Sequence, residues 1–177
     1  MIVFESALVV LVPEAEALVK PFRDRDDPSA AAGVPAHITL LYPFKPPAVI
    51  DARDMETLRQ IFVRFTPLRF ELTRVRRFPA ETLYLEPDPG EPFRQITLEI
   101  WKEFPETPPY GGHHPDIVPH LSVARMADER QLDQVTEAFS LAARNTLPIR
   151  ARVDHAALLD TTSGRWQTRA IFALGGI

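Results

Sequence analysis

Two histidines of this chain each precede a hydroxyl side chain by two residues, inside an apolar run. His37 precedes Thr39 in the string AHITLL, and His120 precedes Ser122 in the string PHLSVA. Such runs are typical of β-strands, whose side chains alternate between two faces, so each histidine shares a face with its hydroxyl partner. Two such strands facing each other would present an acid, a base and two hydrogen-bond donors to one space. This combination suits chemistry at a phosphoryl group.

The remaining sequence predicts the helices and strands that position these two strings. Apolar periodicity predicts helices over 13–25, 51–65, 92–104 and 128–145, and strands over about 2–12, 36–42, 67–77, 81–86, 119–125, 147–160 and 165–174. The order helix, motif strand, helix, strand, strand occurs twice, and the two histidines lie 83 residues apart (120 − 37). We therefore expect an α+β fold with a duplicated, two-lobed arrangement. It would have two mainly antiparallel sheets around a central cleft, helices on the outside, and a single domain over 1–177.

Composition and charge narrow the classes of protein to which this chain could belong. The 177 residues are enough for one well-filled domain. The absence of cysteine excludes disulfides, thiolate metal sites and a cysteine nucleophile. The net charge of −4 argues against a general basic surface, so we expect no long duplex nucleic acid as a partner. Residues 64–77 nevertheless hold five arginines against one glutamate, which leaves a local anionic ligand open.

The first residues of the chain bear on where in the cell the protein is expected. Its first dozen residues are apolar but include Glu5 and lack a basic start, which indicates a buried strand rather than a signal peptide. No apolar run reaches the length needed to span a membrane. We expect a cytoplasmic protein with no membrane partner, and the internal duplication makes a monomer sufficient.

Four aromatic side chains could contribute to substrate binding. Tyr42 and Phe44 follow the first motif, and either could stack on a base at the rim of the cleft, although loop aromatics more often pack on their own domain. Phe78, in a middle strand, has the same two interpretations. Tyr110 lies in a long Pro/Gly loop, residues 105–118, that we expect to form a functional lip beside the site.

Arg125 could also bind phosphate. It lies five residues after His120, however, so strand alternation directs it to the opposite face unless the strand bulges. The adjacent His113 and His114 point apart on an extended segment and have no cysteine beside them, so we predict no metal site. The chain contains neither the G-x-S-x-G string of serine hydrolases nor a Walker-type loop.

Around these residues the chain resembles the two-histidine phosphoesterases of the 2′-5′ RNA ligase family, which carry two H-x-[ST]-apolar motifs in a duplicated α/β fold. The resemblance covers most of the chain. It includes the first motif with its proline-aromatic turn, the second motif with its glycine-containing approach, and paired middle strands: HITLLYPF at 37–44, PYGG at 109–112 with PHLSVA at 119–124, and FP at 78–79 with LYL at 83–85. One departure is Ser122, where threonine is commoner; serine keeps the hydroxyl but lacks the methyl group that limits its rotamers.

The resemblance implies a division of labour within the site. His37 and His120 would transfer protons, and the hydroxyls of Thr39 and Ser122 would donate to phosphate oxygens. In hydrolysis His120 would be the base and His37 the acid, and in ligation the two roles would exchange. This scheme needs no metal ion and no cofactor. The residues themselves are nearly symmetric, so which histidine gives the proton and which takes it stays open.

The leading interpretation is a metal-independent phosphodiesterase that hydrolyses a 2′,3′-cyclic phosphate, a related cyclic phosphodiester or a 2′-5′-linked RNA end. Two alternatives are open: reversible 2′-5′ ligation of RNA, and non-catalytic binding of nucleotides or RNA ends in the same cleft. The presence of both histidines argues against binding alone, since binding needs no acid–base pair. In each case the expected partner is a cyclic phosphate nucleotide or a short RNA end. The physiological substrate and the direction of the reaction stay open.

Overall fold

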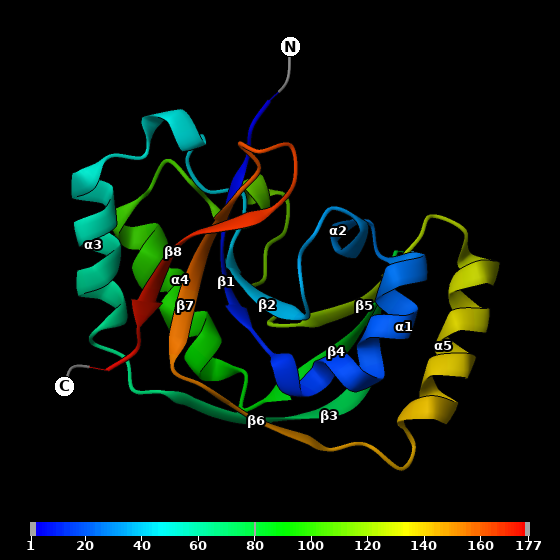
Figure 1. Ribbon diagram of the computed structural model, residues 1–177. Helices are drawn as coiled ribbons and strands as arrows, with labels where there is room; N and C mark the ends of the chain where they lie inside the picture. Colours follow the sequence, from blue (N-terminus) through cyan, green and yellow to red (C-terminus); the bar gives the residue numbers. More distant parts are fainter. Residues whose placement is uncertain (1–2, 80, 176–177) are drawn as a thin grey trace.

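Eight strands pair into one antiparallel sheet within residues 3–79 and 81–175, the ranges that the computed structural model describes (Figure 1). The strands are β1 (Ser6–Leu11), β2 (His37–Leu41), β3 (Leu68–Phe78), β4 (Thr82–Asp88), β5 (Leu121–Arg125), β6 (Ile149–Val153), β7 (His155–Asp160) and β8 (Gln167–Ala173). Their order across the sheet is β6-β3-β4-β5-β2-β1-β7-β8. The two motif strands, β2 and β5, are therefore neighbours at its centre.

The pairing of β2 with β5 corrects one part of the predicted architecture. The α+β class is confirmed, but the two separate sheets are not, because Ile38 lies opposite Leu121 and joins the two four-stranded halves. The resulting single sheet is strongly curled (Figure 1). Both residues are fully buried in one apolar cluster that extends under both halves. Pairing the motif strands thus satisfies their backbone groups and unites the core.

Helices cover the face of the sheet that bears this core. The α-helices are α1 (Glu16–Asp26), α2 (Pro28–Ala31), α3 (Ala52–Phe62), α4 (Glu91–Glu103) and α5 (Glu129–Ala143), with short 3-10 turns at Pro13–Ala15, Pro47–Val49 and Pro109–Gly112. The helices cross over between the halves. α1, which precedes β2 in the chain, packs against β5, and α4, which precedes β5, packs against β2. The two halves are therefore interlocked. Within the described ranges, no helix is long and apolar enough to cross a membrane.

Local signals in the sequence explain where two of these helices begin. The Asp51 carboxylate accepts a hydrogen bond from the Asp54 backbone N–H at 2.9 Å, and the Asp54 carboxylate accepts one from the Asp51 backbone N–H, which forms a capping box before α3. The Asp128 carboxylate caps α5 by accepting from the Gln131 backbone N–H, also at 2.9 Å. The apolar stripe of α3 then buries Leu58, Ile61 and Phe62.

One predicted strand is wrong. The segment 147–160 forms two strands, which separate at Asp154 and lie at different places in the sheet. β6 pairs with β3 at one end, whereas β7 pairs with β1 near the other. The alternation of apolar and polar residues in 149–153 stops at Asp154 and His155, and a continuous apolar run follows, so the break coincides with a change of pattern. The strand predicted over 2–12 begins outside the described residues and within them spans Ser6–Leu11.

Candidate active site

The central strand pair brings the two sequence motifs together. β2 and β5 are antiparallel with Ile38 opposite Leu121, so the neighbouring pairs in this register are His37 with Ser122 and Thr39 with His120. These four side chains are half-buried and lie on the face opposite the helices, since Ile38 and Leu121 point into the core. Side chains opposite each other have Cβ atoms about 5 Å apart, and diagonal neighbours lie about 7–8 Å apart. The two imidazoles thus occupy one diagonal of a square, and the two hydroxyls occupy the other.

Both imidazoles are held in the same way. The Nδ1 atom of His37 lies 2.8 Å from the carbonyl oxygen of Pro35, and that of His120 lies 2.7 Å from the carbonyl oxygen of Val118. A carbonyl only accepts, so each Nδ1 carries the hydrogen. The Nε2 atom of each ring is then left for proton transfer. A neutral ring would accept a proton there, and a protonated ring would donate one.

A bulge in β5 brings Arg125 to the same face. Tyr84 lies opposite Ser122, but Thr82 lies opposite Arg125, so β5 contains one residue more than β4 between these pairs. The extra residue reverses the alternation after Ser122. The guanidinium of Arg125 forms an ion pair with Glu81 beside the motif hydroxyl. The face that alternation alone predicts for Arg125 is therefore wrong, for the reason that the sequence analysis allowed.

An open hollow adjoins the second motif. It has a volume of about 430 Å³, and its lining includes Phe78, Tyr110, His120, Ser122 and Arg125. A volume of this size is ordinary for a small-molecule site. Three candidate binding residues from the sequence thus line the same hollow: Phe78, Tyr110 and Arg125.

Comparison with known proteins agrees with this arrangement. The family model of the 2′-5′ RNA ligase superfamily matches residues 11–165. The chain belongs to the 2′-5′ RNA ligase superfamily. A Bacillus pumilus (strain SAFR-032) protein named "Putative phosphoesterase" is 26% identical over 180 aligned residues, which cover 94% of this chain and 96% of that protein.

Two solved structures share the fold of this superfamily member. Escherichia coli LigT complexed with 3′-AMP matches with a TM-score of 0.65 at 14% identity, over 97% of this chain and 98% of LigT. The protein TT0787 of Thermus thermophilus matches with a TM-score of 0.59 at 18% identity, over 97% of this chain and 98% of that protein. At these identities the likeness concerns the fold.

In this superfamily member the surroundings of both motif histidines favour the neutral imidazole. Burial lowers the pKa of His37 to about 4, and the positive charges of Arg23 and His120 add to this effect against the opposing charge of Asp27. Burial also lowers the pKa of His120, with a smaller contribution from the charge of His114. An anion bound between the two rings would favour the charged forms and raise both values.

The arginine next to His37 is part of a buried ion pair that the sequence analysis missed. Arg23, at the end of α1, is 2% exposed, and its Nε atom lies 2.9 Å from Asp27. Its guanidinium also donates to the Ser29 hydroxyl at 3.0 Å. These contacts hold the turn that leads from α1 into the first motif strand. In the sequence the pair is hidden in a run of alternating charges, RDRDD, that is typical of a solvated helix end.

Aromatic rings surround His120 on three sides. Phe78 meets it edge to face at a centroid distance of 5.0 Å, Tyr84 lies at 5.5 Å, and Tyr110 lies at 6.2 Å with its ring inclined by only 26°. Phe78 and Tyr84 stack on each other at 4.4 Å. Burial raises the pKa of Tyr110 to about 12, so its hydroxyl stays protonated. These rings limit the access of water to the imidazole and strengthen charge interactions there.

The lip that carries Tyr110 is tied to the first motif. The Tyr110 backbone N–H donates to the carbonyl oxygen of Tyr42 at 2.7 Å. Tyr110 has a φ of +53°, and Gly111 and Gly112 follow with +64° and +76°. Only glycine adopts this region without strain, so the two glycines permit the turn and Tyr110 is held in it. The lip predicted from the Pro/Gly composition thus connects both motifs.

Two aromatic candidates lie elsewhere. Phe44 is 5% exposed and packs edge to face against Phe104 at 5.0 Å, so of its two interpretations the structure supports packing on its own domain, in the core. Tyr42 donates from its hydroxyl to Glu5 at 2.9 Å and packs beside Trp166 at 6.2 Å. Its side chain lies in a small apolar cluster rather than in the hollow. Packing on their own domain is the commoner arrangement for loop aromatics, and both residues adopt it.

Of the adjacent histidines, His114 lines the hollow beside Tyr110, at a ring distance of 5.7 Å, and His113 is exposed on the lip. Over residues 3–79 and 81–175, no group of three or more histidine, cysteine, aspartate or glutamate side chains is arranged to hold a metal ion.

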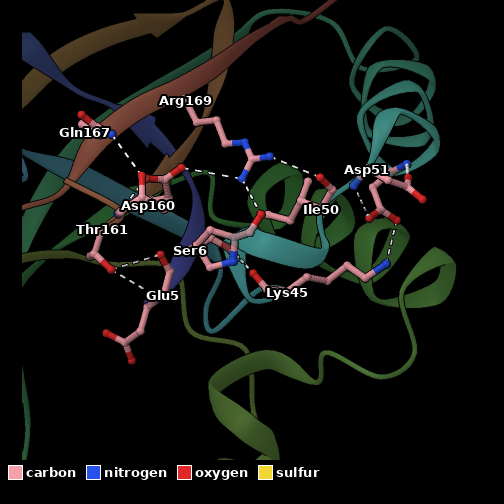
Figure 2. Close-up of polar contacts among 12 residues, drawn as sticks. Glu5, Ser6, Lys45, Ile50, Asp51, Asp160, Thr161, Gln167 and Arg169 are labelled. Atoms are coloured by element: carbon pink, nitrogen blue, oxygen red, sulfur yellow. Dashed lines mark hydrogen bonds and ion pairs between the residues drawn. The ribbon is translucent and has the colours of Figure 1, made fainter. Parts of the chain in front are cut away.

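A separate polar cluster fixes the segment that follows the first motif (Figure 2). The Ser6 hydroxyl donates to the carbonyl oxygen of Lys45 at 2.6 Å. Arg169 donates to two carbonyl oxygens of the same segment, including that of Ile50 at 3.2 Å, and its guanidinium lies 3.7 Å from Asp160. This segment therefore cannot shift without breaking contacts to β1 and β8, and Asp160 of β7 holds the arginine that makes the second set.

Asp160 is the buried centre of that cluster, with 3% of its surface exposed. Burial alone would raise its pKa, but hydrogen bonds from Thr162 and Gln167 and the charge of Arg169 hold the pKa below its usual range. The carboxylate is therefore charged at neutral pH and supports the fold around the first motif.

Proposed function

We propose that this chain is a metal-independent phosphodiesterase that opens 2′,3′-cyclic phosphates by paired-histidine acid–base catalysis. The observation that carries the proposal is the square of side chains on β2 and β5, in which two imidazoles and two hydroxyls alternate around one point. A tetrahedral phosphoryl group placed at that point would have one imidazole on either side. This is the geometry that in-line displacement at phosphorus requires.

In the proposed step each histidine moves one proton. His120, neutral, accepts a proton from water at Nε2 while the water oxygen attacks phosphorus. His37, protonated, donates its proton to the ribose oxygen as the phosphorus–oxygen bond breaks. The hydroxyls of Thr39 and Ser122 donate to the non-bridging oxygens, whose charge is stabilised through the transition state. The product is a nucleoside monophosphate, and exchange with solvent restores the protonation of both rings.

The acid role of His37 depends on the substrate. Its pKa of about 4 leaves the ring neutral in the free protein at pH 7. A phosphate anion about 4 Å away would stabilise the imidazolium by about 4 kcal/mol at an effective dielectric constant of about 20, which raises the pKa by about three units. Binding of the substrate would thus protonate the Nε2 atom of His37, which then donates this proton to the leaving oxygen. In the free protein Nε2 would carry no proton.

Support for a nucleotide substrate comes from the hollow and from the structural relatives. The hollow of about 430 Å³ beside His120 offers two aromatic rings and one guanidinium, which suit a base and a phosphate. The matching LigT structures are described as complexes with 3′-AMP, ATP, NADP+ and phosphate. The superfamily name also covers ligation, for which the same two imidazoles would exchange roles.

The test is turnover of 2′,3′-cyclic mononucleotides and of 2′-5′ dinucleotides in the presence of EDTA. We expect EDTA-resistant hydrolysis of the cyclic phosphates, lost in His37→Ala. The position of the phosphate in the product, 2′ or 3′, identifies the leaving oxygen. Incubating RNA ends that carry 2′,3′-cyclic phosphate and 5′-hydroxyl groups tests ligation directly. Activity that requires a divalent metal, or that survives in His37→Ala, would refute the proposal.

A further inference from the structure

The two sides of the catalytic square differ. On the β1 side, the apolar face formed by Val9 and Leu159 is covered, because the turn between β7 and β8 folds over it. The Trp166 backbone N–H donates to the carbonyl oxygen of Ala32 at 3.0 Å, and Arg165 reaches the carbonyl oxygen of Ala31. The hollow on the β4 side is therefore where the part of a substrate beyond its phosphate would lie.

The walls of this hollow are aromatic. Phe78, at the end of β3, and Tyr110, in the lip, both line it, and both rings lie against the ring of His120. Phe78 and Tyr110 are each half-buried, so part of each ring is accessible. Flat aromatic walls favour a flat aromatic ligand, and a base attached to the reacting ribose is such a group.

The rim of the hollow carries two carboxylates and one guanidinium. Glu81 and Asp116 both line it. Glu81 is engaged by Arg125, whereas Asp116 is exposed on the lip and takes part in none of the ion pairs found within the described residues. A free carboxylate repels a second phosphate and accepts hydrogen bonds only. It therefore suits a ligand whose polar edge donates.

We propose that this hollow binds the base of the substrate and that Asp116 selects bases with an exocyclic amino group over uracil. The proposal rests on the proposed function, since it places the base relative to the reacting phosphate. Guanine, adenine and cytosine each present an amino group to a carboxylate acceptor. Uracil presents two carbonyl oxygens on either side of its single N–H, so a carboxylate meets like partial charges there.

The experiment compares kcat/KM for the 2′,3′-cyclic phosphates of guanosine, adenosine, cytidine and uridine. For the unmodified chain we expect values about tenfold higher for the three amino-bearing bases than for uridine. In Asp116→Asn, which keeps the shape but can donate as well as accept, this preference should fall to about twofold or less. Glu103→Gln removes the same charge from the exposed end of α4, outside the hollow, and should leave the preference unchanged.

The results of these assays show whether Asp116 selects among the bases. Equal kcat/KM for all four substrates in the unmodified chain would overturn the proposal, as would an Asp116→Asn variant that slows all four equally. If no cyclic nucleotide is turned over, the proposed function fails, and base selection is tested by titration calorimetry with the four nucleoside 3′-monophosphates. Tighter binding of the amino-bearing nucleotides, lost in Asp116→Asn, would then support it, and equal binding would overturn it.

Discussion

Binding of an anion between the motif strands should raise the pKa of His37 from about 4 to about 7. In the free protein, burial is the main cause of the low value. A unit negative charge about 4 Å from the imidazolium contributes about 4 kcal/mol at an effective dielectric constant of about 20, equivalent to about three pK units. Sulfate is the suitable probe, because its charge stays constant over the whole titration and it has the shape of phosphate. Since it carries two negative charges, about three pK units is the smallest shift expected.

The assay is an NMR titration of the histidine ring protons with and without sulfate, with chloride at equal ionic strength as the control. His37→Asn assigns the signal. By linkage, sulfate affinity must rise by about two hundred- to five hundredfold as pH falls from about 7 to about 4, because the protonated ring binds the anion better. A double variant, Thr39→Val with Ser122→Ala, should lose most of this response. Saturation with sulfate without a change in the titration of His37 would refute the reasoning.

Three further predictions concern individual side chains. Thr39→Val should lower kcat by about a hundredfold or more with the fold intact, because one donor to the phosphate oxygens is lost, and Thr39→Ser should restore most of it, as steady-state kinetics would show. Phe44→Ala should reduce the free energy of unfolding by about 3–5 kcal/mol in urea titrations, whereas Val49→Ala, at an exposed residue, should change it by less than about 0.5 kcal/mol; similar effects would contradict the core position of Phe44. Asp160→Asn should cost about 1–3 kcal/mol at pH 7. Since the pKa of Asp160 is depressed in the folded state, its stabilisation is present above the unfolded pKa and is lost as pH falls, so the difference from the unmodified chain should shrink in acid.

Local patterns predicted most of the elements and grouped the four residues of the candidate site. The period-2 alternation around His37 and His120 placed each histidine with its hydroxyl, and the repeated element order placed both in equivalent strands. The capped helices over 52–62 and 129–143 also follow from the sequence, through Asp51 and Asp128. These features depend on neighbours in the chain, which the sequence shows directly.

What the sequence did not reveal depends on contacts between distant segments. The continuous sheet depends on the pairing of Ile38 with Leu121. The split of 147–160 depends on its two parts pairing with different strands, β6 with β3 and β7 with β1. The face of Arg125 depends on a bulge set by its partner strand. The buried pair of Arg23 with Asp27 is likewise created by packing, since charged residues at a helix end are exposed unless another element covers them.

The two motifs are proposed to form a single catalytic unit. A double-variant cycle of His37→Ala and His120→Ala tests it, with the rate of opening of a 2′,3′-cyclic mononucleotide in EDTA as the readout. Each single variant should lower kcat/KM by about a thousandfold or more, and the double variant should be little slower than either, because an acid without its base, or a base without its acid, retains little function. Losses that multiply in the double variant, or activity that survives either single change, would contradict the account.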